Sequence, residues 1–240
     1  SDNKANQQAN FSALRNYATY GTYNPTRNIL SEQALKAMNP QELLTMLKSL
    51  KNYKMTVLYY GPSSLKAIDQ LVTKTVQSPK TFAAVPAQKR YVEQTTPKNE
   101  VVIAPYDAKN IYMVQLHNEN QEWSADRAPV IALFNEYFGG SMNAIVFQEL
   151  REARGLAYSA FARYDEPYRL GDKESFYTYI ITQNDKMMDC VHEFNKLLND
   201  MPVRQAGFDL AKQSLMKSLA SARTTKYGIL TSYLAAQRLG

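Results

Sequence analysis

The chain has 240 residues, of which 45% are apolar and 21% charged, and its formal net charge is +6. This length and composition suit one large or two modest globular domains. The basic residues are scattered among acidic ones and form no run of five or more, so we predict no nucleic-acid partner. No apolar stretch approaches the ~20 residues that span a membrane, so we expect no membrane insertion. The single cysteine, Cys190, cannot form an internal disulfide and is interpreted as a small buried helix residue.

The first 80 residues carry mainly helical patterns. Helices are expected to begin near Ser31 and Asn39, where short polar residues precede apolar residues at helical spacing. A third helix is expected over Ser63–Val76. Between the second and third helices, the run Lys54–Tyr60 is apolar, β-branched and aromatic, which predicts a strand.

The composition changes after residue 80. Residues 81–99 place prolines among Gln, Lys and Thr, as in a linker between domains. We therefore predict three parts, namely residues 1–80, a linker over 81–99, and a last domain over 100–240.

The last domain opens with a predicted hairpin formed by Glu100–Ala104 and Asn110–Leu116. A helix over Ser124–Phe138 follows, and a glycine pair ends it. Ser141 is well placed to cap the next helix. Gly155 is expected to end that helix as a C′ glycine.

Two strands and two helical regions complete the chain. Strands are predicted over Leu156–Tyr164 and Ser175–Thr182, and the even residues of the first, Tyr158 included, would share one face. The pair Asn184–Asp185 would cap a helix, and a last helical region would cover Gln205–Arg238. The strands pair by hairpins, so the predicted class is α+β, with a mainly antiparallel sheet packed against helices.

The segment from Phe138 to Ser159, FGGSMNAIVFQELREARGLAYS, holds the residue types suited to chemistry. Its Gly139-Gly140 pair precedes a helix, where glycines allow close backbone approach to a ligand, although a simple turn also explains them. The guanidinium of Arg151 can hydrogen-bond carbonyl oxygens or a carboxylate, and the hydroxyl of Tyr158 can hydrogen-bond an oxyanion. The residues by themselves favour the plainer interpretation, a surface arginine on a charged helix and a core tyrosine.

This segment resembles the C-terminal-domain signature of the pitrilysin/insulinase (inverzincin) metallopeptidases. A Gly-Gly turn, a helix with FQELRE and the string GLAYS follow in the family's order. The spacing from Arg151 to Tyr158 matches the family's substrate-binding Arg/Tyr pair. Upstream, NPTRNILSEQALKAMNPQELLTMLKSL and KMTVLYYGP resemble the end of the preceding family domain, and IYMVQL resembles an early strand of the last domain.

The resemblance implies a metallopeptidase-like α/β-roll domain preceded by the end of a second such domain, in a clamshell of repeated α+β domains. Residues 1–80 would then be the C-terminal portion of the preceding domain. Zinc would be held in an N-terminal half on H-x-x-E-H plus a downstream Glu. The last domain would supply no catalytic residue of its own, and Arg151, Tyr158, Gly139 and Gly140 would support substrate binding.

The two histidines, His117 and His192, do not form a zinc motif. Neither begins H-x-x-E-H, and Lys196 occupies the place where H-E-x-x-H would need its second histidine. We therefore expect no metal or cofactor on this chain, and we interpret His192 as a helix-surface residue.

The function implied by the resemblance is the substrate-binding, non-zinc half of a zinc endopeptidase, inactive by itself and acting on peptides. Its expected partner is the N-terminal zinc-bearing half, which the partial domain before the linker favours on the same polypeptide. The alternative is a catalytically dead structural or assembly subunit of the same family. The sequence leaves the compartment open between cytoplasm and periplasm.

Overall fold

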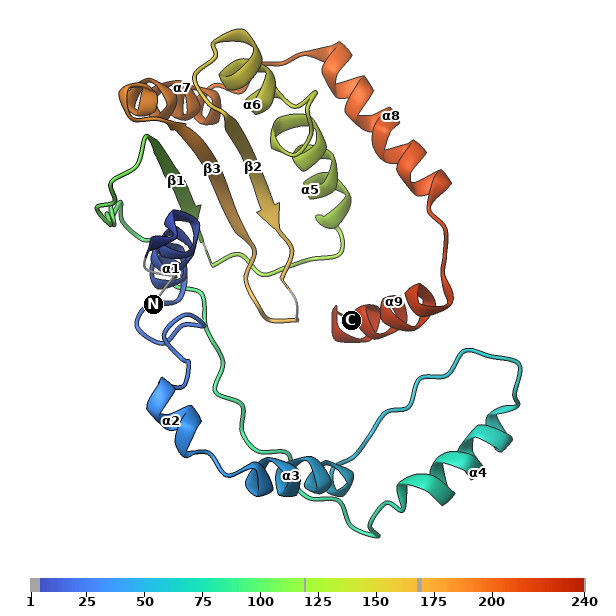
Figure 1. The fold of residues 1–240 in the computed structure, drawn as a ribbon. Coiled ribbons are helices and arrows are strands. Elements are labelled where there is room, and N and C mark those ends of the chain that lie inside the picture. Colours follow the sequence, from blue (N-terminus) through green and yellow to red (C-terminus); the bar gives the residue numbers. More distant parts are fainter. Residues whose placement is uncertain (1–4, 119, 168–169, 240) are drawn as a thin grey trace. The chain divides into compact units, whose positions relative to one another are not determined.

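The computed structural model describes residues 5–118, 120–167 and 170–239 (Figure 1). The chain divides into two compact units, the first formed by residues 1–27, 92–223 and 238–240 and the second by residues 28–91 and 224–237. The elements are, in chain order, α1 Gln7–Tyr20, α2 Glu32–Ala37, α3 Pro40–Ser49, η2 Leu50–Asn52, α4 Leu65–Val76, β1 Asn110–His117, α5 Ala128–Phe134, η3 Asn135–Gly139, α6 Ile145–Phe147, η4 Gln148–Ala153, β2 Ser159–Asp165, β3 Ser175–Gln183, η5 Asn184–Lys186, α7 Met187–Asn199, α8 Gln205–Ser221 and α9 Lys226–Leu239.

The first unit is built on a three-stranded antiparallel sheet. Its strand order is β1-β3-β2, so the central strand β3 pairs with both others. Tyr179 of β3, for example, lies opposite Val114 of β1 and Phe161 of β2. The mixture of helices with an antiparallel sheet confirms the predicted α+β class.

The core lies between one face of this sheet and the helical segments η3 and η4, which lie between β1 and β2 in sequence, and α7, which follows β3. Burial alternates along β3 as the pleat requires, with Ile180 1% exposed. Phe138, Leu150 and Phe194 bring apolar side chains from η3, η4 and α7 to the same core. Each such side chain contributes about 1.5–3 kcal/mol when removed from water.

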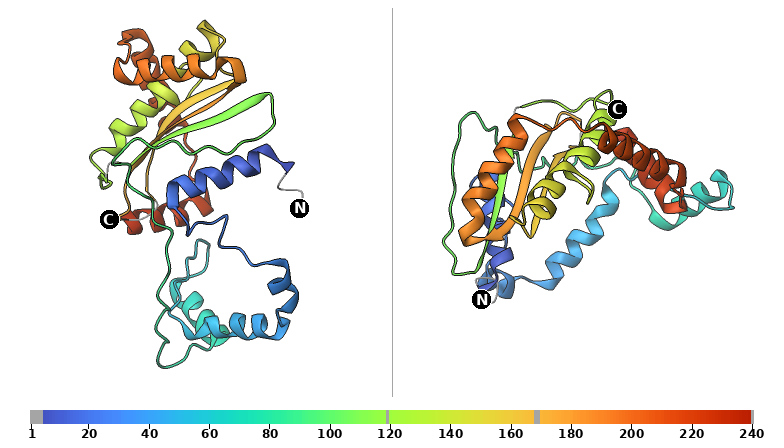
Figure 2. Two further views of the ribbon diagram at one scale, coloured as in Figure 1. Left: turned by 90° about the vertical axis from the view of Figure 1, so that its left-hand side faces the viewer. Right: turned by 90° about the horizontal axis from the view of Figure 1, so that it is seen from above.

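Helix α1 lies on the opposite face of the sheet (Figure 2), and this face bears aromatic side chains. The ring of Phe11 on α1 contacts the rings of Tyr112 and Tyr179 edge-on, at centroid distances of 5.5 and 6.2 Å. Helix α1 therefore covers the part of this face formed by β1 and β3. No helix among residues 5–118, 120–167 and 170–239 is long and apolar enough to cross a membrane.

Several local predictions are confirmed. The side chains of Ser31 and Asn39 cap α2 and α3, accepting hydrogen bonds from the backbone N–H groups of Ala34 and Gln41. Cys190 is fully buried on α7, and His192 lies exposed on the same helix. Short polar caps and helical spacing act locally, so the sequence reveals them directly.

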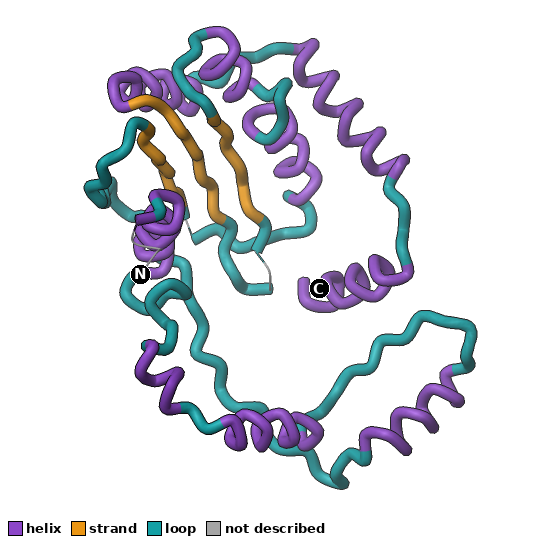
Figure 3. The backbone as a smooth tube through the Cα atoms, viewed as in Figure 1, coloured by secondary structure: helices purple, strands orange, loops and turns teal. Residues whose placement is uncertain are grey.

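The second unit contains α2, α3, α4 and most of α9, but none of its residues is buried. The strand predicted over Lys54–Tyr60 is wrong, because this segment is a loop (Figure 3). A strand needs a partner for its backbone N–H and C=O groups, and no segment of the described chain pairs with this one.

The predicted hairpin is also wrong. The segment Glu100–Ala104 forms no strand, and β1 instead pairs with β3, which lies more than sixty residues further along the chain. Val101 and Ile103 are 83% and 77% exposed. A short apolar run predicts an extended segment but does not identify its pairing partner.

Three further details of the last domain differ from the sequence prediction. Ser141 does not cap a helix, because α6 begins after Ala144 and the Ser141 hydroxyl donates to the carbonyl of Glu136. Asn184 and Asp185 lie in a short 3₁₀ turn ahead of α7, and the Asn184 amide donates to a distant carbonyl.

The last helical region is interrupted by residues 222–225, which separate α8 from α9. Ala222 is extended, and the hydroxyl of Thr225 accepts from the N–H of Gly228 in the manner of a helix cap. The division into residues 1–80, 81–99 and 100–240 remains a prediction.

Candidate functional site

Buried apolar side chains hold the turn that carries Arg151 in place. Helix α6 passes directly into the π-helical turn η4, and Ile145, Val146 and Leu150 are buried beneath it. Gly155 then adopts φ +59°, and its N–H donates to the carbonyl of Arg151 at 3.0 Å. This left-handed glycine ends the helix as predicted and directs the chain into β2.

Tyr158 lies just before β2, where the strand pattern is offset by one residue. Its N–H donates to the carbonyl of Ile181 at 2.8 Å, although the register partner of Ile181 is Ser159. Two consecutive residues thus face one partner, as in a β-bulge. Tyr158 is 76% exposed while Ala160 is buried, so the prediction that these two share a face is wrong.

The offset turns Tyr158 toward Arg151. The guanidinium carbon of Arg151 lies 5.8 Å from the centroid of the Tyr158 ring and 4.9 Å from that of Phe147. Such cation–π contacts are worth about 0.5–1 kcal/mol at an exposed site. The Nε atom of Arg151 also lies 3.7 Å from a carboxylate oxygen of Glu152. The structure therefore brings the Arg/Tyr pair together on an accessible surface.

The Arg/Tyr pair offers hydrogen-bond donors to a ligand. The Arg151 side chain is 47% exposed, so its planar N–H groups remain reachable from solvent. The hydroxyl of Tyr158 adds one further donor beside them. Carbonyl and carboxylate oxygens are the groups that such donors bind, and a peptide backbone presents a row of them.

The glycine pair serves packing. A Cβ atom at Gly139 would overlap the backbone of Ala162, so the absence of a side chain lets η3 approach β2 closely. Gly139 is itself buried, whereas Gly140 is exposed and its N–H donates to the carbonyl of Asn135 at 2.6 Å. A direct contact of either glycine with a ligand remains a prediction.

Asn135 covers the outer edge of β2. Its side-chain amide donates to the carbonyl of Tyr164 at 3.0 Å and accepts from the N–H of Tyr164 at 2.9 Å. Gly139 packs over the neighbouring edge position, Ala162. The edge is thus occupied along this stretch and unavailable to an added strand.

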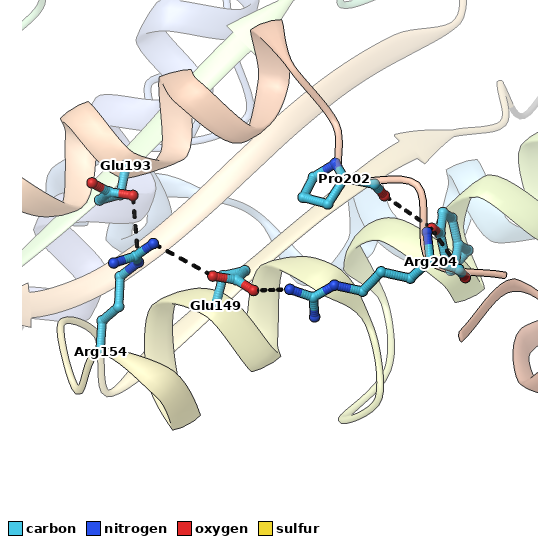
Figure 4. A network of polar contacts seen from close by, with 6 residues as sticks. Glu149, Arg154, Glu193, Pro202 and Arg204 are labelled. Carbon is cyan, nitrogen blue, oxygen red and sulfur yellow. Dashed lines mark hydrogen bonds and ion pairs between the residues drawn. The ribbon is translucent and has the colours of Figure 1, made fainter. Parts of the chain in front are cut away.

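An ion-pair network beside Arg151 escaped the sequence prediction (Figure 4). Arg154 lies between Glu149 and Glu193, with N···O distances of 3.6 and 3.4 Å, and Arg204 pairs with the other oxygen of Glu149. In the sequence, the one sign of this network was the five-residue spacing of Glu149 and Arg154. Ion pairs on an α-helix join residues three or four apart, so this spacing did not predict a pair.

The described residues do not fit a metal site. No group of three or more His, Cys, Asp or Glu side chains among them could hold an ion. His117 and His192 are exposed. Burial raises the pKa of the Cys190 thiol, which donates to the carbonyl of Leu156, so Cys190 is a poor nucleophile.

Comparison with known families decides the assignment. The model of the peptidase M16 inactive domain matches residues 38–215. The chain belongs to this family. The match confirms the resemblance found in residues 138–159, to the C-terminal, non-zinc part of such peptidases. No curated protein matches the chain.

Solved structures of the M16 family share the fold of this chain. A peptidase M16 inactive domain from Pseudomonas fluorescens aligns over 98% of this chain and 56% of its own, with 16% identity and a TM-score of 0.61. The periplasmic protease PqqL from Escherichia coli aligns over 95% of this chain and 26% of its own, with 13% identity and a TM-score of 0.65.

A chain of complex III2 from Candida albicans with Inz-5 bound is also similar. It aligns over 97% of this chain and 57% of its own, with 11% identity and a TM-score of 0.58. The present chain thus spans about half the length of the first of these structures. At these identities the likeness concerns the fold alone.

Proposed function

We propose that this chain is the substrate-binding, non-zinc half of a zinc metallopeptidase that encloses extended peptides between two halves. The observation that carries the proposal is the exposed Arg151/Tyr158 pair, presented together by a chain of the M16 inactive-domain family. Family membership supplies the reaction class, and the pair supplies a reason for this chain to contact substrate.

Each residue of the pair has a distinct part. The guanidinium of Arg151 holds a carbonyl oxygen of the peptide, and the hydroxyl of Tyr158 donates to the oxyanion or to the next carbonyl. A donor that acts in the transition state is worth about 2.7–4 kcal/mol. The other half would hold zinc, which would provide the activated water when bound. The chain by itself therefore binds peptide without hydrolysing it.

An extended peptide can also add to a sheet as an extra strand. Of the two edge strands, β2 is covered by Asn135 and Gly139. We therefore place any added strand along the outer edge of β1. Hydrogen bonds from other segments mark the two ends of this edge. The side-chain amide of Gln7 donates to the carbonyl of Asn110 at one end, and the hydroxyl of Thr96 accepts from the N–H of Asn118 at the other.

The zinc-bearing half is the proposed partner, on the same polypeptide. The second unit supports this, because its amphipathic helices leave their apolar faces uncovered. Leu47 of α3 is 64% exposed, and Leu65 and Leu71 of α4 are 80% and 59% exposed. Large uncovered apolar patches mark surfaces that another protein segment buries. We infer that this unit completes its core against the remainder of the preceding domain, to which residues 1–80 are proposed to belong.

The test is the turnover of a peptide by the complete enzyme carrying Arg151→Ala or Tyr158→Phe. Each variant should lower kcat/KM about a hundredfold, because one transition-state donor is lost. Arg163→Ala is the matched control, since Arg163 is also exposed and paired with a neighbouring acid, Asp165, outside the site. Full activity in both site variants would rule out the proposed roles.

A structural subunit is the second candidate, since a chain of complex III2 shares the fold. In that case the surface around Arg151 would bind a neighbouring subunit. The coding sequence upstream discriminates the two candidates. An intact H-x-x-E-H motif there supports the peptidase, and a degenerate motif supports the scaffold.

A further inference from the structure

Glu149 occupies the centre of the ion-pair network beside the site (Figure 4). Its carboxylate serves two arginines, one on each oxygen, namely Arg204 on Oε1 and Arg154 on Oε2. The Glu149 side chain is only 15% exposed, whereas the side chains of Arg154 and Arg204 are 42% and 46% exposed. One shielded carboxylate therefore holds two solvent-facing cations in place.

The network ties the π-helical turn to a fixed frame. Arg154, which ends the turn, also reaches Glu193 on α7. Arg204 belongs to the link between α7 and α8, and its backbone N–H donates to the hydroxyl of Tyr137 at 2.8 Å. That hydroxyl in turn donates to the carbonyl of Pro202 at 3.0 Å, and Tyr137 is only 8% exposed.

The geometry of the turn explains why this tie matters for Arg151. In an α-helix, residues four apart are stacked on one face, whereas a π-helical turn stacks residues five apart. Glu149 and Arg154 are five apart and form an ion pair across η4. Their attraction favours the π form. Relaxation to an α-helical turn would shift the following residues by one place, or about 100° around the axis.

Arg151 lies between the two residues of this pair, so the turn sets the direction in which its side chain leaves the helix. We propose that Glu149 is a positioning residue that keeps the Arg151 guanidinium over the rings of Phe147 and Tyr158. In that place the guanidinium meets a substrate carbonyl. This inference rests on the proposed function of Arg151 and adds a residue that does not itself touch substrate.

The experiment compares Glu149→Gln with the native chain by ¹⁵N NMR. The Nε–H resonance of Arg151 reports its stacking on two aromatic rings. Removal of the carboxylate should move this resonance toward its position in an unstacked arginine. In the complete enzyme the same variant should lower kcat/KM about tenfold to a hundredfold, the cost of a misplaced contact.

Glu174→Gln is the control for stability. Glu174 is also a shielded carboxylate, with a side chain 1% exposed and an ion pair to Arg127 at 2.9 Å, but it lies outside the network. Its variant should lower the melting temperature and leave the Arg151 resonance in place. Arg154→Gln provides a second test if Glu149→Gln fails to fold, and should move the resonance in the same direction.

An unmoved Arg151 resonance in Glu149→Gln or Arg154→Gln would overturn the inference, as would an equal movement in Glu174→Gln. Failure of the proposed function has a different signature. In that case Arg151→Ala keeps full activity, whatever the resonance of Arg151 does in the network variants.

Discussion

The two π-helical turns of the first unit have the same backbone form and opposite uses. In η3, Tyr137, Phe138 and Gly139 are buried, and the turn packs on strand β2. In η4, only Leu150 is buried, and the turn presents Arg151 to solvent. Rare π-helical turns often mark functional sites. The difference in burial between the two turns therefore distinguishes η3, which holds the fold together, from η4, whose exposed side is accessible to a ligand.

The largest effect on stability should come from the buried turn. Phe138 is 1% exposed and stacks on Phe134 at 5.1 Å. Phe138→Ala should lower the free energy of unfolding by about 3–5 kcal/mol, because it removes apolar contacts and leaves a cavity. Urea denaturation of the chain measures this loss. A loss below about 1 kcal/mol would show that η3 is not part of the core.

Gly139→Ala tests the close approach of η3 to β2. The new methyl group would meet the backbone of Ala162, which cannot move aside as a side chain can. Overpacking of this kind costs about 1–3 kcal/mol. Gly207→Ala on α8 is the matched control, since its Cβ would lie 3.5 Å from its nearest neighbour. This control should gain stability by about 0.5–1 kcal/mol in the same denaturation experiment.

Asn135→Ala tests the covered edge of β2. The substitution leaves the N–H and C=O of Tyr164 without the side-chain partner that bonds both. Unfolding should become easier by about 0.5–1.5 kcal/mol for each of these hydrogen bonds that is lost. Hydrogen exchange at the Tyr164 amide should accelerate, and unchanged protection there would contradict the proposed cover.

Arg151→Ala should have the smallest effect on stability. The side chain is half exposed, and its removal loses two cation–π contacts worth together on the order of 1 kcal/mol. The melting temperature should fall by only a few degrees. A loss of stability as large as that of Phe138→Ala would show that Arg151 holds the fold together. The contrast between the two turns would then disappear.

Local signals in the sequence predicted what local physics controls. The caps at Ser31 and Asn39 and the glycine stop at Gly155 depend on neighbours within one or two turns, and all are present. The burial of Cys190 was predicted from its place on an amphipathic helix, although distant segments provide its surroundings. That Arg151 and Tyr158 act as a pair was predicted from the family resemblance. A spacing of seven residues across a helix end does not by itself determine whether two side chains are in contact.

Pairing between distant segments could not be predicted in the same way. The segment Lys54–Tyr60 has a strand composition but no partner in the described chain. One extra residue at the start of β2 reversed the expected direction of Tyr158. Arg154 has several acidic neighbours in the sequence, so the sequence does not tell which of them it pairs with. The π-helical turn brings Glu149 of the same helix next to it.

The most direct test of the account is a double-mutant cycle on Arg151→Ala and Tyr158→Phe in the complete enzyme, followed by kcat/KM for one peptide. If both residues hold the same stretch of substrate, their effects should be non-additive by about 0.5–3 kcal/mol, as for residues in contact. The double variant should then lose less activity than the two single losses predict together. Full activity in all three variants would contradict the claim that this chain contributes a substrate-binding pair.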